Sequence, residues 1–144
     1  SVRQEQIDLA LIGIGENAHI AFNDPPADFD TKEAFRIVTL DRRCKEQQVG
    51  EGWFSSVEDV PKLAVSMTVY QIMQSKAIVS SVPFRVKANA IKQMMENKVI
   101  NQIPATILKT HPQFALFLDL DSASLLDESY LSDQSDVEFL EIPL

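Results

Sequence analysis

The chain has 144 residues and a formal net charge of −8, from 13 Lys and Arg against 21 Asp and Glu. The two signs balance through Lys109, so the acidic excess lies between Thr110 and Leu144. This balance argues against nucleic-acid binding, which depends on clustered basic residues. No run approaches the roughly 18 apolar residues of a membrane-spanning helix, and the first residues lack the apolar core of a signal peptide. The single cysteine, Cys44, leaves no internal disulfide and favours a reducing, cytoplasmic compartment.

The first half of the chain alternates apolar runs with polar segments. Residues 7–14, IDLALIGI, predict a buried strand that ends in glycines. A loop over residues 15–30 follows, and residues 35–40 predict a second strand. Residues 42–48 are polar and predict a helical turn. Residues 56–74 contain no glycine and predict a helix, with a proline near its start, where proline is tolerated.

The second half continues the alternation. Residues 77–82 predict a third strand, and residues 87–97 predict a helix whose apolar residues share one face at spacings of 3, 4 and 7. Residues 106–108 form a short segment, and residues 114–118 predict a fourth buried strand. Residues 122–126 predict the beginning of another helix.

Strands that alternate with helices predict an α/β fold with a mostly parallel, Rossmann-like sheet flanked by helices. We expect residues 1–126 to form one α/β unit and residues 127–144 to form an acidic tail. There are no internal repeats and no low-complexity tract.

The loop after the first strand is the candidate functional site, because ligands of open α/β sheets bind beyond the carboxyl ends of strands. His19 can exchange protons near neutral pH, and Asp24 is close enough in sequence to orient its ring. Asn17 can fix the ring from the other side. A purely structural histidine is the alternative that spacing alone leaves open. The candidate residues, including two glycines that permit close backbone approach, are Gly13, Gly15, Asn17, His19 and Asp24.

Other site motifs are missing from the sequence. The GxG has no third glycine of a dinucleotide site, no GKS or GKT follows it, and there is no G-x-S-x-G elbow. His19 and His111 are the only histidines, and no cysteine cluster accompanies them, so no metal site is predicted.

The segment GIGENAHIAFNDP, residues 13–25, resembles the signature of the glucosamine-6-phosphate deaminase/isomerase family, within a wider group that includes 6-phosphogluconolactonases. The continuation Ala21-Phe22-Asn23 favours the deaminase branch. The resemblance covers about residues 7–126 in collinear order and also runs through Val60-Pro61-Lys62, Ala77 to Lys87, Ile103 to Leu108 and His111-Pro112.

The resemblance implies isomerisation of an amino-sugar phosphate from aldose to ketose, with release of ammonia and without a redox cofactor. His19 then assists opening of the sugar ring, and Asp24 partners His19. Lys87 contacts the substrate phosphate as a point charge; without the resemblance it reads as a solvated residue at the start of a helix. Asn17 stands where the deaminases usually carry Asp, and an amide orients an imidazole without stabilising its charged form.

Two departures from the family pattern bear on activity. The family's phosphate-binding Arg precedes Trp53-Phe54, but residues 45–52 read KEQQVGEG here. The resemblance also matches only the C-terminal half of a larger domain, whose other half carries a phosphate loop and the aspartate that acts as general base. We therefore expect the chain alone to be inactive.

Half a sheet leaves a strand edge and apolar faces uncovered, so we expect a homo-oligomer or association with the missing N-terminal half. The expected ligand is a phosphorylated amino sugar, with no nucleic-acid or membrane partner. Two alternatives stay open: a 6-phosphogluconolactonase-like hydrolase, and a sugar-phosphate-binding module without catalysis.

Overall fold

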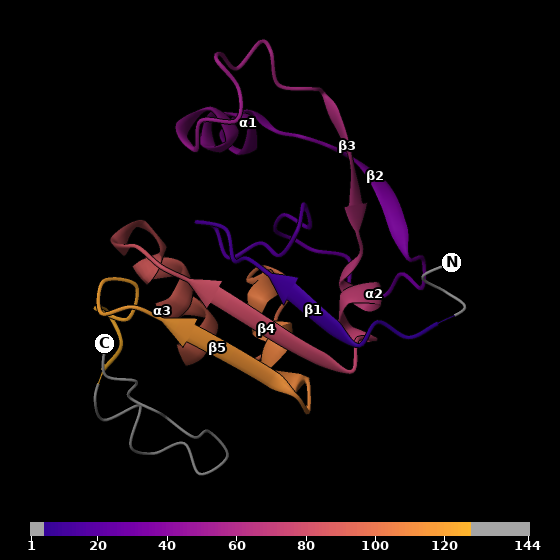
Figure 1. Cartoon of the computed structure of the whole chain (residues 1–144), viewed down its shortest axis with the longest axis vertical. Helices are drawn as coiled ribbons and strands as arrows, with labels where there is room; N and C mark the ends of the chain where they lie inside the picture. The colour runs from indigo at the N-terminus through magenta and orange to yellow at the C-terminus, as the bar shows by residue number, and fades with distance from the viewer. Residues whose placement is uncertain (1–4, 128–144) are drawn as a thin grey trace.

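The computed structural model describes residues 5–127 and contains two β-sheets, one of three strands and one of two (Figure 1). The predicted strands over 35–40, 77–82 and 114–118 and the helix over 87–97 are confirmed, and the first strand is shorter than predicted. Most of the expected acidic tail lies outside the described residues. The elements in chain order are β1 (Leu9–Ile12), β2 (Phe35–Thr39), α1 (Arg42–Gly50), β3 (Leu63–Met67), α2 (Val69–Met73), β4 (Ala77–Val82), η1 (Arg85–Lys87), α3 (Ala88–Glu96), η2 (Pro104–Thr110) and β5 (Phe114–Leu118).

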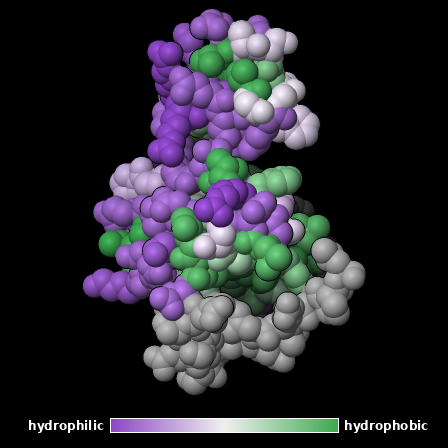
Figure 2. Space-filling model, turned by 90° about the vertical axis from the view of Figure 1, so that its left-hand side faces the viewer, coloured by the Kyte–Doolittle hydropathy of each residue, from purple (hydrophilic) through white to green (hydrophobic). Residues whose placement is uncertain are grey.

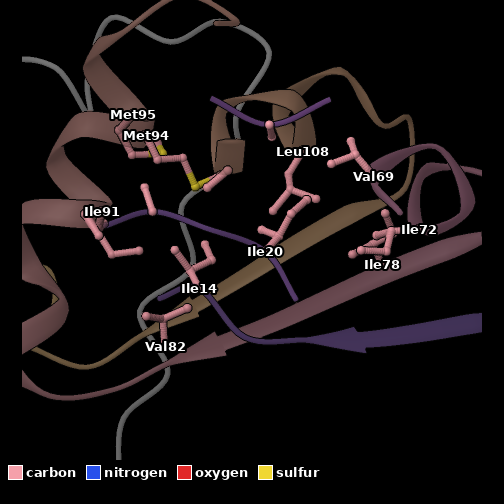
Figure 3. Packing of buried hydrophobic residues seen from close by; sticks show 14 residues of the cluster. Ile14, Ile20, Val69, Ile72, Ile78, Val82, Ile91, Met94, Met95 and Leu108 are labelled. Atoms are coloured by element: carbon pink, nitrogen blue, oxygen red, sulfur yellow. The ribbon is translucent and has the colours of Figure 1, made fainter. Parts of the chain in front are cut away.

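The three-stranded sheet is parallel, with the strand order β1-β4-β5. Alternate residues of each strand point to the same face, and one face of this sheet packs against α3 and η2. Helix α3 buries the side that the 3, 4 and 7 spacing predicts, including Ile91 and Met94. Figure 3 shows these side chains gathered with Ile20, Ile78 and Leu108 in the main core.

The opposite face of the parallel sheet carries no helix within residues 5–127 (Figure 1). Leu9, Leu11 and Phe117 point to this side and are 51%, 76% and 47% exposed. The strand register places Val79 and Ala115 between them. We call these five residues the open face. The open face adjoins an unpaired strand edge, because β1 pairs only with β4 among the described residues.

The second sheet is an antiparallel pair of β2 and β3 that stands away from the first. Together with α1 it forms residues 35–67, which we call the arm. Figure 2 shows the arm as an upper lobe joined to the larger body by a narrower waist. The arm has its own small core, formed by Leu40, Cys44 and Val60.

The predicted helix over 56–74 is wrong over most of its length. Leu63 to Met67 form strand β3, and only Val69 to Met73 form a helix, α2, which begins after the N-cap Thr68. Five consecutive pairs join β3 to β2, so long-range pairing decides the structure of a run that local pattern left ambiguous.

The beginning of a helix predicted over residues 122–126 is also wrong, because this stretch forms turns. Both Asp119 carboxylate oxygens accept backbone N–H groups, one from Ser122 and one from Phe84, and this holds the turn on the loop after β4. No helix among the described residues is long and apolar enough to cross a membrane.

Candidate active site

The loop after β1 folds back on itself and holds His19 above Gly15. The N–H of Gly15 donates to the carbonyl of His19, and the N–H of Ala18 donates to the carbonyl of Gly15, both at 2.9 Å. The reversal requires left-handed backbone, with φ of 65° at Ala18 and 50° at Ala21. Such angles are costly for residues with a Cβ and occur where the surrounding structure holds them in place.

Gly15 is the position at which the loop needs a glycine. A Cβ built there would lie 2.4 Å from both Cε1 and Nε2 of the His19 ring, which is far inside van der Waals contact. Gly13 differs, because a Cβ at that position would meet nothing within 4 Å. The first glycine therefore leaves open space, and the second makes room for the imidazole.

His19, Asp24 and Asn17 form a connected group. Nδ1 of His19 lies 2.9 Å from Oδ1 of Asp24, with only 12% and 26% of the two side chains exposed. The Asn17 amide donates to the same carboxylate oxygen at 3.0 Å, and its Oδ1 accepts the backbone N–H of His19 at 3.1 Å. The structure thus brings together the three residues that the sequence singled out as a possible relay.

The pKa of Asp24 lies below its ordinary value, mainly because the carboxylate accepts a hydrogen bond from His19. The Asn17 amide and the positive charge of Arg43 lower the same pKa further, and partial burial opposes them. Asp24 is therefore held ionised and fixes Nδ1 as the nitrogen that faces it. The other ring nitrogen, Nε2, is left for a ligand.

Two further contacts attach the loop to the arm, and no local sequence pattern indicates either of them. The Asn23 amide is buried and donates to the carbonyls of Ile20 and Met67, both at 2.8 Å. The N–H of Phe22 donates to Oγ of Ser66 at 3.1 Å. The position of His19 thus depends on strand β3, more than 40 residues away in sequence.

A cleft of about 390 Å³ lies between this loop and the arm. Gly13, Gly15 and His19 line it from the loop, and Lys87 lines it from η1. Asp24 and Asn17 are not among the lining residues; they support the imidazole. Gly13, Gly15 and His19, which follow β1, therefore share one cleft with Lys87, which follows β4.

The arm supplies lining residues that the sequence analysis missed. Gln47 and Gln48 from α1 and Glu51 just beyond it face the same cleft. They lie within the stretch noted for its lack of arginine, but nothing local to that stretch shows that it overhangs His19.

The site can transfer a proton and hold an anion. The His19 imidazole lines the cleft with the Asp24 carboxylate behind it, and Lys87 lines the same cleft. No group of three or more His, Cys, Asp or Glu side chains suited to a metal ion occurs within residues 5–127.

Comparison with known proteins identifies glucosamine-6-phosphate deaminases as relatives by sequence, although no protein-family model matches the chain. The glucosamine-6-phosphate deaminase of Exiguobacterium sibiricum is 41% identical over 127 residues, which cover 88% of this chain and 49% of that protein. The deaminase of Oenococcus oeni is 38% identical over 127 residues, with 88% and 52% covered. The chain spans about half the length of the curated relatives it matches.

Solved structures give the same picture. A monomeric glucosamine-6-phosphate deaminase superposes with a TM-score of 0.76 and 33% identity, over 82% of this chain and 47% of that one. The 6-phosphogluconolactonase of Trypanosoma brucei superposes with a TM-score of 0.62 and 17% identity, over 83% and 42%. The lactonase shares the fold, whereas the deaminase shares fold and sequence.

Proposed function

From the homology of this chain to about half of a glucosamine-6-phosphate deaminase, we propose that it forms the histidine-bearing half of an amino-sugar-phosphate deaminase. Such an enzyme isomerises an aldose phosphate to a ketose and releases ammonia. The observation that carries the proposal is His19, backed by Asp24 and open to a cleft that also holds Lys87.

His19 opens the sugar ring in this proposal. Ring opening removes the proton of the O1 hydroxyl, breaks the C1–O5 bond and places a proton on O5. One imidazole nitrogen can accept the first proton and return it to the second oxygen. Nε2 of His19 is suited to this, since Nδ1 already faces Asp24 at 2.9 Å. Asn17 is a positioning residue, because it bonds the carboxylate and the backbone N–H of His19.

Lys87 binds the substrate phosphate. It lies at the N-cap of α3, where the first backbone N–H groups and the helix dipole favour an anion. The side chain lines the cleft and forms no ion pair with a carboxylate of the described residues. Gly13 adds backbone that a ligand can approach closely, whereas Gly15 makes room for the His19 ring.

The test measures the affinity of the 144-residue chain for glucosamine 6-phosphate by calorimetry. Lys87→Ala is expected to weaken binding about tenfold or more, and His19→Ala is expected to weaken it less, since its main effect falls on turnover. Lys92→Ala is the matched control, because Lys92 lies on α3 and pairs with Glu96 away from the cleft. Equal affinity in the wild type and Lys87→Ala would contradict the assignment of the phosphate contact.

In this proposal the general base that abstracts the substrate proton, and the polypeptide that carries it, lie outside residues 5–127. The open face and the free edge of β1 support association with a polypeptide equivalent to the other half of the relatives, or with a second copy. Ammonia release is then expected only when that polypeptide is co-expressed. Turnover by the chain alone would refute this part of the proposal. The single cysteine supports a cytoplasmic setting.

A sugar-phosphate-binding module without turnover is the second candidate, and Asn17 is the observation that favours it. An amide in that position gives the imidazolium no opposing charge. Binding of glucosamine 6-phosphate without ammonia release in the complemented protein would favour this candidate.

A further inference from the structure

Gln47 and Gln48 of α1 and Glu51 just beyond it line the cleft and have no role in the chemistry described above. We propose that Gln48 and Glu51 bind the hydroxyl and amino groups of the sugar, and that Glu51 makes the cleft select a ligand with both a phosphate and an ammonium. This inference rests on the proposed function and concerns the same cleft.

Helical spacing explains why these residues face the cleft. Cys44 is buried against the small core of the arm and thereby sets which side of α1 turns inward. Gln47, Gln48 and Glu51 lie three, four and seven positions further along, so they continue the same side. Beyond the small core this side carries polar residues and lines the cleft, whose other lining residues include apolar ones such as Phe22 and Met67. Polar side chains within a partly apolar cleft are typical of groups that orient a ligand.

The Glu51 carboxylate is held in place before any ligand arrives. One oxygen accepts from the Gln47 amide at 2.7 Å, and the other accepts from the indole N–H of Trp53 at 3.3 Å. Gln48 is half-buried, and its side-chain amide has no hydrogen-bond partner among the described residues. The first residue is oriented and the second is unsatisfied, so both are ready to bond a ligand.

The charges of the cleft have opposite signs on its two walls. Apart from the imidazole, Lys87 and Glu51 are the only ionisable residues that line it within residues 5–127. A phosphate on Lys87 leaves a negative carboxylate for the rest of the sugar. That carboxylate favours an ammonium, accepts from a hydroxyl and repels a second anion. An amino-sugar phosphate has the matching pair of charges, whereas a phosphorylated sugar acid has two negative ones.

The test compares three probes with the wild-type chain: glucosamine 6-phosphate, glucose 6-phosphate and 6-phosphogluconate. Affinities come from calorimetry. Trp53, the single tryptophan, adds a local fluorescence signal because its indole bonds Glu51. We expect the amino sugar to bind about threefold tighter than glucose 6-phosphate, the size of a partly exposed charge pair, and 6-phosphogluconate to bind weakest.

Two variants separate the two roles. Glu51→Gln keeps the shape and is expected to abolish the preference for the amino sugar and to tighten 6-phosphogluconate binding about threefold. Gln48→Ala is expected to weaken all three probes by similar factors, since it removes a neutral hydrogen bond. Glu46→Gln is the control: it lies on the outer side of α1, pairs with Arg42 and does not line the cleft. Circular dichroism checks that each variant is folded.

The outcomes distinguish this inference from the function on which it rests. If the wild type binds none of the three probes, the proposed function fails. If the wild type binds them and Lys87→Ala weakens binding, but Glu51→Gln keeps the preference for the amino sugar, only the present inference fails. An unchanged Trp53 signal on saturation with the amino sugar would also contradict contact at Glu51.

Discussion

Substitution of Gly15 by Ala tests the construction of the site most directly. The new Cβ would lie 2.4 Å from Cε1 and Nε2 of His19, whereas ordinary contact begins at 3.4 Å. The imidazole must therefore move by about 1 Å. A shift of that size carries Nδ1 beyond hydrogen-bonding reach of Asp24, from which it now lies 2.9 Å. The added methyl group should also cost about 1–3 kcal/mol of folding stability, as overpacking does.

The assay is a carboxylate NMR titration of Asp24 in the wild type and in Gly15→Ala. The pKa of Asp24 is lowered chiefly by its bond to His19, so displacement of the ring should raise this pKa toward its ordinary value. Gly50→Ala is the matched control, because a Cβ there meets nothing within 4 Å. In the complemented enzyme, a misplacement of 1 Å should reduce ammonia release about a hundredfold. An unchanged Asp24 titration in a folded Gly15→Ala variant would refute the reasoning.

Asp24→Asn should lower the free energy of unfolding at pH 7, since the carboxylate that holds the imidazole is lost. The folded pKa of Asp24 lies below 3.8, so the stability that its carboxylate contributes is present above about pH 4 and disappears as the pH falls through the folded value. The urea midpoints of the wild type and Asp24→Asn should therefore converge at low pH, and a difference that persists there would contradict this. Asn23→Ala should cost about 1–3 kcal/mol in urea unfolding, because two buried carbonyls lose their donor. Leu11→Lys on the open face should reduce self-association in sedimentation, whereas Leu120→Lys, which is even more exposed but off that face, should not.

Much of the fold could be predicted because local pattern and tertiary role agree in the parallel sheet. Residues 77–82 and 114–118 are short apolar runs that become β4 and β5, and the side of α3 that is apolar in sequence is the side that packs. The arm could not be predicted in this way. Residues 63–67 suit a strand or a helix equally, and their pairing with β2 brings together segments about 30 residues apart.

The residues of the site also differ in whether the sequence alone could predict them. His19, Asp24 and Asn17 lie within eight positions of one another, so the sequence could suggest their contacts before the structure showed them. Lys87 required the resemblance, because a lone lysine at the start of a helix carries no signal. Glu51 could not be found from sequence, since its place on the cleft depends on how the arm stands above the loop.

Recognition and proton abstraction are separable in this arrangement. The cleft walls that carry His19, Lys87 and Glu51 are built entirely from residues 5–127, whereas the resemblance assigns the general base to the half of the relatives that this chain does not match. Affinity for a sugar phosphate should then be a property of the chain itself, and turnover should be a property of its assembly across the open face. A substitution on the open face should therefore impair turnover in the complemented protein while binding persists. A substitution in the cleft should impair both, because substrate that is not held cannot reach the base.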